Sequence, residues 1–143
     1  MLIADFAINN NNQQSHFADW KGLMPQTERT YDESQITERL RDLPGWYFED
    51  GWIRRVYKTD GWPTTLMLVN AIGYCSEAAN HHPDLAVTYA RVTVKLSTHS
   101  AGGITDKDFA LARQIEQIAL WRPGEGSPLT GTPNKFVRSG DPR

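Results

Sequence analysis

The sequence predicts an α+β fold with the element order α-β-β-α-β-β-α, a four-stranded antiparallel sheet and helices packed on one face. Segments 46–58 and 85–98 each contain two aromatic or β-branched runs separated by a tight turn, which is typical of β-hairpins. Segments 32–43, 62–79 and 105–120 carry apolar residues at helical spacing and flank these hairpins. Hairpins are antiparallel pairs, so this alternation favours an antiparallel sheet covered by helices.

Composition indicates one domain between two less regular ends. The chain has 143 residues, of which 39% are hydrophobic, and this is enough for a single core. Residues 1–28 include an unbroken run of Asn and Gln, so we expect a disordered leader there. The expected domain covers residues 29–121. Residues 122–143 should form an extended tail, because repeated Pro and Gly exclude regular secondary structure.

Charge, cysteine content and hydropathy exclude several classes of protein. The net charge is −2 with a pI of about 6.1, which argues against direct nucleic-acid binding, since a phosphate backbone requires a basic surface. The one cysteine, Cys75, lies in an apolar helical run, as expected for a buried thiol in a reducing compartment. The sequence does not open with a basic head and an apolar core, so we expect no signal peptide, and no apolar run approaches the roughly 20 residues that span a bilayer. We therefore expect a cytoplasmic protein that binds no membrane.

The first helix and the first hairpin are defined by their end signals. Asp32 begins the pattern of a capping box, and Pro44-Gly45 should end the helix. Strands are expected on either side of Asp50-Gly51, which is a strong two-residue turn signal.

The second helix is expected over residues 63–79, with proline at its first position and Asn80 after its end. Its apolar residues cover a broad face, so we expect it to pack against both the sheet and a partner subunit. Trp46, Trp52 and Trp62 are expected in the core or in a subunit interface.

The second hairpin and the third helix complete the predicted domain. Strands are expected over 85–89 and 92–98, with a turn at Ala90-Arg91. Thr105 and Asp108 have the spacing of a capping box, which predicts the start of the third helix.

Adjacent histidines in the loop after the second helix carry the most chemistry. His81-His82-Pro83 forms a tight loop, so the two imidazoles should diverge and can address opposite sides of one bound molecule. Histidine suits proton transfer because it gains and loses a proton near neutral pH. The alternative is that both histidines only make turn hydrogen bonds before Pro83.

A third histidine, His99, follows the last strand, where a side chain can project toward the His81-His82 loop. It is equally well explained as a surface histidine at a strand end. Three histidines and a carboxylate could bind a metal ion, but adjacent histidines chelate one ion poorly and the spacings of zinc motifs are absent. We therefore expect no metal site.

Two carboxylates are candidates to support the histidines. Glu77 lies four residues before His81, within reach of that imidazole if the helix extends that far, and a carboxylate there would fix the tautomer. An ordinary helix-end charge explains Glu77 equally well. The capping box fully accounts for Asp108, although capping and a role in the site are compatible.

Together these residues resemble the signature of the pterin-4a-carbinolamine dehydratases. Every position and spacing of the pattern matches, and the likeness covers roughly residues 32 to 120. It includes Leu-Pro-Gly-Trp at 43–46 and Ile-Thr-Asp-Lys-Asp-Phe at 104–109, and the tail is similar to that of some bacterial members. The pattern reads Glu77-x3-His81-His82-Pro83-x5-Tyr89-x9-His99-x8-Asp108.

The resemblance implies a fold, an assembly and a reaction. The fold is the one predicted above, assembled as homodimers or homotetramers. The reaction is dehydration of 4a-hydroxytetrahydropterin to quinonoid dihydropterin, a step of tetrahydrobiopterin recycling that needs no metal, flavin or nicotinamide cofactor. His81, His82 and His99 would carry acid–base catalysis, with Glu77 and Asp108 in support. Residues expected to meet the pterin are Asn80, Pro83, Ser97 and Thr98.

The resemblance also leaves a second class of function open. The family includes dimerisation cofactors of a transcription factor and assembly factors for Rubisco, so a protein partner is the alternative to a pterin substrate. The complete set of histidines favours catalysis, whereas the leader and tail suit partner binding. One departure is Leu85, which stands where many members carry an aromatic residue, so we expect weaker stacking on the pterin.

Overall fold

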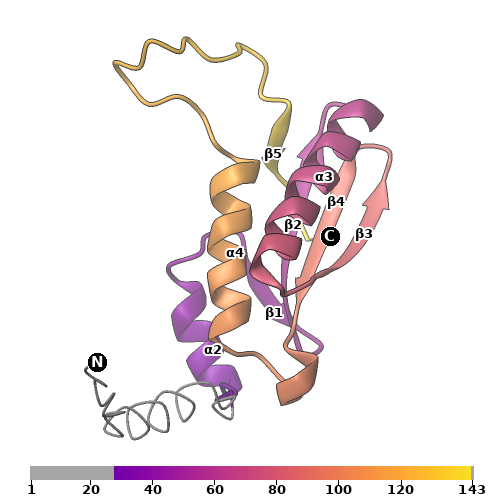
Figure 1. Ribbon diagram of the computed structural model, residues 1–143, viewed down its shortest axis with the longest axis vertical. Helices are drawn as coiled ribbons and strands as arrows, with labels where there is room; N and C mark the ends of the chain where they lie inside the picture. Colours follow the sequence, from indigo (N-terminus) through magenta and orange to yellow (C-terminus); the bar gives the residue numbers. More distant parts are fainter. Residues whose placement is uncertain (1–27, 143) are drawn as a thin grey trace, which may run out of the picture.

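The computed structural model describes residues 28–142, which form a single antiparallel sheet with helices on one face (Figure 1). The order of elements confirms the predicted α-β-β-α-β-β-α plan and adds a fifth strand. The disordered leader was predicted for residues 1–28, which, except for Glu28, lie outside the described residues. In chain order the elements are α2 (Glu33–Leu40), β1 (Tyr47–Glu49), β2 (Trp52–Thr59), α3 (Trp62–Ala79), β3 (Asp84–Thr88), β4 (Arg91–Leu96), the 3-10 helix η3 (His99–Ala101), α4 (Asp106–Ala119) and β5 (Val137–Ser139).

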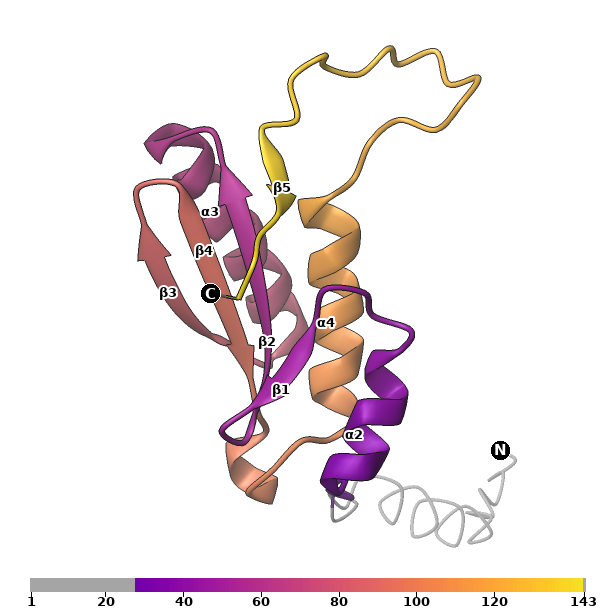
Figure 2. The ribbon, with the colours of Figure 1, turned by 180° about the vertical axis from the view of Figure 1, so that it is seen from behind.

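The sheet has the strand order β1-β2-β4-β3, so the two hairpins meet through β2 and β4. Ile53 pairs with Leu96, and Tyr57 pairs with Val92, which places these four apolar side chains on one buried face. Helices α3 and α4 lie side by side over that face, and the opposite face is left open by the helices (Figure 2). The core therefore lies between the sheet and these two helices.

Helix ends follow the predicted local signals. Asp32 and Gln35 form a reciprocal capping box at α2, and Thr105 and Asp108 form another at α4. Asn80 ends α3 in the left-handed conformation, with a φ of 49°.

The first hairpin turn is equally well explained by its sequence. Asp50 and Gly51 have φ values of 51° and 80°, as a two-residue turn that matches the twist of the strands requires. The left-handed region is easily reached by Gly and tolerated by Asp, so Asp50-Gly51 fixes the register of β1 on β2.

An ion pair between a buried arginine and a partly buried glutamate joins β2 to α4. Arg55 is 2% exposed and its Nη2 lies 2.8 Å from Glu116 Oε1. Tyr57 and Trp46 also donate hydrogen bonds to Glu116, at 2.6 and 3.0 Å. A Cβ at Gly45 would lie 2.5 Å from the Arg55 guanidinium, so the loop before β1 needs glycine there.

Several element boundaries differ from the sequence prediction, among them the second hairpin turn and the end of α2. The second turn is Tyr89-Ala90 rather than Ala90-Arg91, because Thr88 and Arg91 pair directly as the last rung of the β3–β4 ladder. Helix α2 ends at Leu40, earlier than Pro44-Gly45 suggested. Proline disfavours helical geometry in the residue before it, and the chain closes with tighter turns, such as Leu43 N–H to Leu40 O at 3.0 Å.

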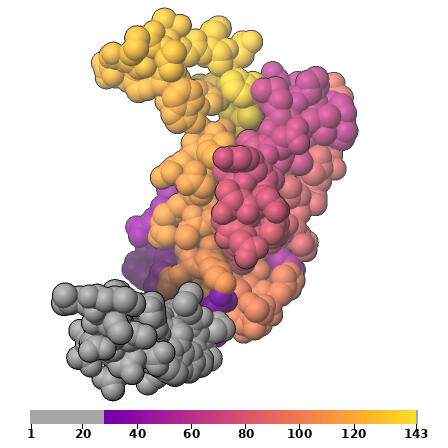
Figure 3. Space-filling view, in the orientation of Figure 1, coloured from indigo at the N-terminus to yellow at the C-terminus, as the bar shows by residue number. Residues whose placement is uncertain are grey.

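The prediction that the tail holds no regular structure was wrong at its end. The tail projects beyond the helices and then returns as β5, which pairs with β2 (Figures 1 and 3). Val137 is buried, Ser139 Oγ accepts a 2.8 Å hydrogen bond from Arg55, and Gly140 N–H donates to Val56 O. The stretch 136–139 contains neither Pro nor Gly, so it can fill the edge of β2 that β1 leaves unpaired.

Helix α3 is buried on its sheet side and exposes apolar side chains elsewhere. Met67 is 61% exposed and Tyr74 is 77% exposed, as a helix with a broad apolar face would be in a single chain. Contact of this surface with a partner subunit stays a prediction. Among residues 28–142, α3 and the other helices fall short of the length and hydropathy of a membrane-spanning segment.

Candidate active site

The loop after α3 brings His81 against the first turn of α4. Asn80 reverses the chain, and His81 N–H then donates to Ser76 O at 3.1 Å. The imidazole turns inward, so that His81 Nε2 lies 2.7 Å from Asp108 Oδ1. Asp108 is fully buried, and 13% of the His81 side chain remains exposed. A fully buried carboxylate therefore contacts Nε2 of a histidine that remains partly exposed to solvent.

Asp108 is held by further donors on its second oxygen. Thr98 Oγ1 donates to Asp108 Oδ2 at 2.8 Å, and Thr105 N–H donates to the same oxygen at 2.9 Å. Asp108 therefore caps α4, as its spacing predicted, and also contacts a histidine. These bonds restrain the carboxylate from two elements at once, the end of β4 and the start of α4.

Glu77 binds His82 instead of His81, which corrects the sequence prediction. His82 Nε2 lies 2.9 Å from Glu77 Oε2, on a pair whose side chains are 56% and 84% exposed. The helix spacing of Glu77 and His81 did not decide the contact, because the left-handed Asn80 breaks the helix between them. Beyond that break His81 turns toward α4, and His82 is left on the side of Glu77.

His99 lies at the exposed start of η3, directly after Thr98. Its ring packs edge-on against Trp52, with centroids 5.5 Å apart and planes at 73°. Lys95 Nζ lies 5.1 Å from the centroid of the Trp52 ring. Trp52 was expected only in the core or an interface. Its contact with His99 could have been inferred from the pairing of β2 with β4, which aligns Ile53 with Leu96, three residues before His99.

The expected pterin-contacting residues lie around these histidines and differ in exposure. Asn80 is exposed, while Pro83 and Ser97 are partly buried. Thr98 is 2% exposed, and its backbone N–H and C=O are already bonded within the η3 turn, to Gly103 and to Ala101 and Gly102. The Thr98 backbone therefore has no free N–H for a ligand.

A hollow of about 280 Å³ lies beside His81, between the end of α3 and the first turns of α4. His82 and His99 are outside its lining. It is lined by Ala79, His81, Lys107, Ala110, Leu111 and Gln114.

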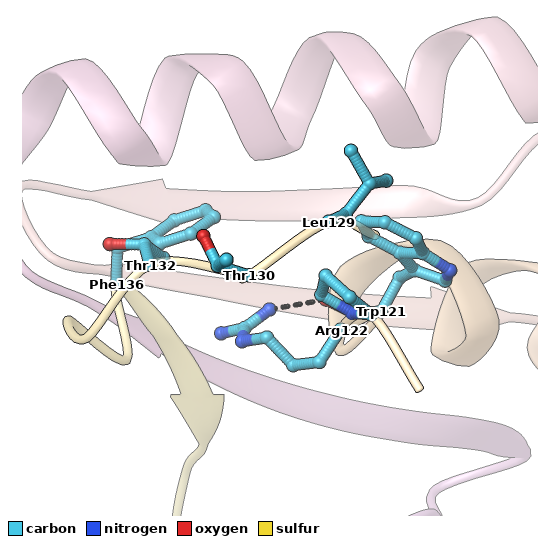
Figure 4. A pocket seen from close by; sticks show the side chains of 8 residues that line it. Trp121, Arg122, Leu129, Thr130, Thr132 and Phe136 are labelled. Carbon is cyan, nitrogen blue, oxygen red and sulfur yellow. Dashed lines mark hydrogen bonds between the residues drawn. The ribbon is translucent and has the colours of Figure 1, made fainter. Parts of the chain in front are cut away.

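Another hollow, of about 340 Å³, is built by the tail around Trp121, Leu129 and Phe136 (Figure 4). It lies at the opposite end of α4 from Asp108, about 20 Å along the helix axis. Its lining has no histidine or carboxylate, so the proton-transfer groups belong to the site at His81 and not to this one.

The arrangement suits proton transfer better than metal binding. Within residues 28–142 no group of three or more His, Cys, Asp and Glu side chains is arranged to hold a metal ion. Instead, each imidazole of the His81-His82 loop has its own carboxylate partner, which orients the ring through Nε2. An imidazole held in this way can donate and accept protons.

Two similar proteins carry the same functional name. A protein of Aquifex aeolicus, provisionally named pterin-4-alpha-carbinolamine dehydratase, is 43% identical over 90 residues, which are 63% of this chain and 91% of the relative. One of Nocardia farcinica with the same provisional name is 43% identical over 93 residues, covering 65% and 97% of the two chains.

Solved structures and a family model extend the comparison. A crystal structure of a transcriptional coactivator/pterin dehydratase from Brucella melitensis is similar, with a TM-score of 0.60 and 34% identity over 64% of this chain and 99% of that one. A pterin dehydratase-like RuBisCO assembly factor of the alpha-carboxysome aligns with a TM-score of 0.44 and 12% identity, which is too remote to bear on function. The model of the pterin 4 alpha carbinolamine dehydratase family matches residues 29–118, and the chain belongs to that family.

Proposed function

We propose that this protein dehydrates 4a-hydroxytetrahydropterin to quinonoid dihydropterin by histidine acid–base catalysis. The observation that carries the proposal is the 2.7 Å contact between His81 Nε2 and the fully buried Asp108. Burial of a carboxylate is costly unless its charge is bonded, so a structure that keeps Asp108 beside a partly exposed histidine favours a chemical use of that histidine.

The reaction requires one proton to be given and another to be taken. The lone pair of the ring nitrogen expels the 4a-hydroxyl, and the C4a–O bond breaks as a C=N bond forms. A protonated imidazole supplies the proton that turns the leaving hydroxyl into water. A neutral imidazole removes the proton of the ring N–H. The two transfers balance, because one imidazole loses a proton and another gains one while water leaves. The total charge of the enzyme is unchanged, and each histidine recovers its starting protonation state by proton exchange with solvent.

His81 and His99 form the proposed proton-transfer pair, with His82 as the second acid–base or positioning group. Asp108 orients His81, and Glu77 orients His82. Trp52 restrains His99 through its edge-on ring contact. Asn80, Pro83 and Ser97 flank these histidines along the chain and are proposed to contact the pterin.

The test is stopped-flow loss of enzymatically generated 4a-hydroxytetrahydropterin with wild type, His81→Ala and His99→Ala. We expect wild type to accelerate the loss strongly and either variant to reduce the rate at least about 100-fold, within the range that a positioned acid or base contributes. Gln117→Ala is the matched control, because Gln117 is exposed on α4, the helix of Asp108. A folded wild-type protein that does not accelerate the loss over buffer would contradict the proposal.

A binding role is the second candidate, and the exposed apolar side chains of α3 favour it. Met67 and Tyr74 offer a surface that a second copy of the chain or a different protein would cover. The Brucella melitensis relative is described as a coactivator as well as a dehydratase. Full dehydratase activity in Tyr74→Ser, together with loss of self-association in analytical ultracentrifugation, would assign this surface to homo-oligomer assembly. Unchanged self-association would remove that support.

A further inference from the structure

Two buried threonines connect the start of α4 with Asp108 by a directed chain of hydrogen bonds. Lys107 N–H donates to Thr105 Oγ1 at 3.3 Å, and the hydroxyls of Thr105 and Thr98 lie 2.7 Å apart. Thr98 Oγ1 lies 2.8 Å from Asp108 Oδ2. An ionised carboxylate only accepts, so the single hydroxyl proton of Thr98 points to Asp108. Thr105 must then donate to Thr98, and the direction of the chain is fixed.

The same argument fixes the proton on the His81 ring. Asp108 Oδ2 already accepts from Thr98 and from Thr105 N–H, which orients the carboxylate with Oδ1 toward His81. A carboxylate oxygen at 2.7 Å from Nε2 requires the proton to be on Nε2. In the neutral imidazole, Nδ1 is then the ring nitrogen with the free lone pair. His81 lines the hollow beside α4, and 13% of its side chain is exposed.

We propose that Thr98 and Thr105 are positioning residues that lock His81 in its Nε2–H form, so that Nδ1 is the atom that exchanges protons with the substrate. This inference rests on the proposed dehydratase function for its catalytic part. Neither threonine needs to touch the substrate, since both are 2% exposed and act through Asp108. The ring form itself is a property of the free protein and can be measured without turnover.

The chain offers a matched control for the cost of removing a buried hydroxyl. Thr59 and Thr65 form a second buried threonine pair, with their hydroxyls 2.7 Å apart, and Thr65 donates to Tyr89 O at 2.9 Å. This pair bonds to backbone groups, whereas the Thr98–Thr105 pair bonds to a carboxylate. Thr65 lies in the first turn of α3, about 20 Å from the Asn80 end by helical rise.

The first measurement is the ¹⁵N spectrum of the histidine side chains in wild type, Thr98→Val, Thr98→Ser and Thr65→Val. Wild type, Thr98→Ser and Thr65→Val should show His81 with a proton on Nε2 and none on Nδ1. Thr98→Val should show a mixture of both ring forms, because one donor that orients Asp108 is gone. A wild-type His81 protonated at Nδ1, or a Thr98→Val spectrum identical to wild type, would overturn the inference.

The second measurement is the dehydratase rate of the same four proteins. Thr98→Val should lower kcat about tenfold, as loss of one hydrogen bond to a charged group predicts, with KM changed less than about twofold. Thr98→Ser should restore kcat to the wild-type value. Thr65→Val should keep the wild-type kcat, even if its melting temperature falls as much as that of Thr98→Val. Equal losses in Thr98→Val and Thr65→Val would reduce Thr98 to a structural residue. If wild type has no activity while His81 is locked at Nε2–H, the proposed function fails and the positioning chain stands.

Discussion

His81 and His82 are neighbours in the chain, and each is bonded through Nε2 to a carboxylate, but the two pairs differ in nearly every physical respect. The His81 partner, Asp108, is 27 residues away and fully buried, whereas the His82 partner, Glu77, is five residues away and 84% exposed. Asp108 has two further donors on its other oxygen. Glu77 lies in the last turn of α3 and His82 lies just beyond its end, and the two side chains are hydrogen-bonded to each other.

The difference shows that a carboxylate beside a histidine indicates a functional role only when its burial and its other hydrogen bonds are also considered. Water screens the Glu77–His82 pair, so its contact energy is small and its geometry is easily lost. Asp108 cannot exchange its bonds for water, so its orientation, and that of His81, is set by the fold. We therefore expect His81 to have the larger role in the proposed catalysis, although the two histidines look equivalent in sequence.

Asp108→Asn, which changes the partner of His81, should have the largest effect on activity. The amide oxygen of the substituted side chain must face Thr98 and Thr105 N–H, which turns its NH₂ group toward His81 and demands the opposite ring form. We expect kcat to fall at least about 100-fold, since the wrong ring form in a Ser-His-Asp triad costs about 10⁴-fold. The ¹⁵N spectrum should show His81 protonated at Nδ1. A kcat within about threefold of wild type would mean that Asp108 only caps α4.

Glu116→Gln tests whether burial of a carboxylate on α4 matters for catalysis without a histidine partner. Glu116 is partly buried, and its partners are Arg55, Tyr57 and Trp46. Burial alone raises the pKa of Glu116, but hydrogen bonds from Arg55 and Tyr57 outweigh burial and lower this pKa. A lowered pKa stabilises the folded protein above the unfolded pKa of about 4.3, and this stabilisation is lost as the pH falls through the folded value.

At pH 7 we therefore expect Glu116→Gln to lower the free energy of unfolding by about 2 kcal/mol, the range for hydrogen bonds to charged groups. Urea unfolding from pH 7 down to pH 3 measures the difference from wild type, which should shrink below about pH 4.3. The kcat at pH 7 should stay within about twofold of wild type if burial and catalysis are separate properties. A difference in stability that grows as the pH falls would contradict the assigned sign.

Glu77→Gln should have the smallest effect. The exposed pair is worth less than about 1 kcal/mol, so we expect roughly a two- to threefold decrease in kcat and an unchanged melting temperature. Steady-state rates at low and high ionic strength provide the check, because salt should remove the difference between the variant and wild type. A loss as large as that of Asp108→Asn would remove the distinction between the two pairs.

Local signals in the sequence were sufficient for most of the fold. The Asp32 and Thr105 caps, the Asp50-Gly51 turn and the Asn80 helix end each depend on residues at most three positions apart, and all four were predicted correctly. The tail strand was missed because it is stabilised by pairing with the edge of β2, which is distant in the sequence. The residues around Val137 carry no local signal for that pairing.

The sequence identified most of the candidate site residues but not how they pair. Spacing pointed to the three histidines, Glu77 and Asp108, but it assigned Glu77 to His81 on helical spacing, which does not hold across the left-handed Asn80. The contact of Asp108 with His81 joins residues 27 positions apart and depends on how α4 packs beside the end of α3. Thr98 was predicted as a substrate contact, whereas its hydroxyl points into the buried network. Tertiary packing decides the contacts of Asp108, whereas the local turn at Asn80 decides the Glu77–His82 pair.

The most direct test of the unequal roles is a stopped-flow comparison of His81→Gln with His82→Gln, using 4a-hydroxytetrahydropterin and folded protein. Glutamine keeps a polar side chain of similar reach at both positions but cannot transfer a proton at neutral pH. We expect His81→Gln to lower kcat at least about 100-fold and His82→Gln to lower it less than about tenfold. Equal losses, or a larger loss in His82→Gln, would contradict the assignment of the main proton transfer to the histidine held by Asp108.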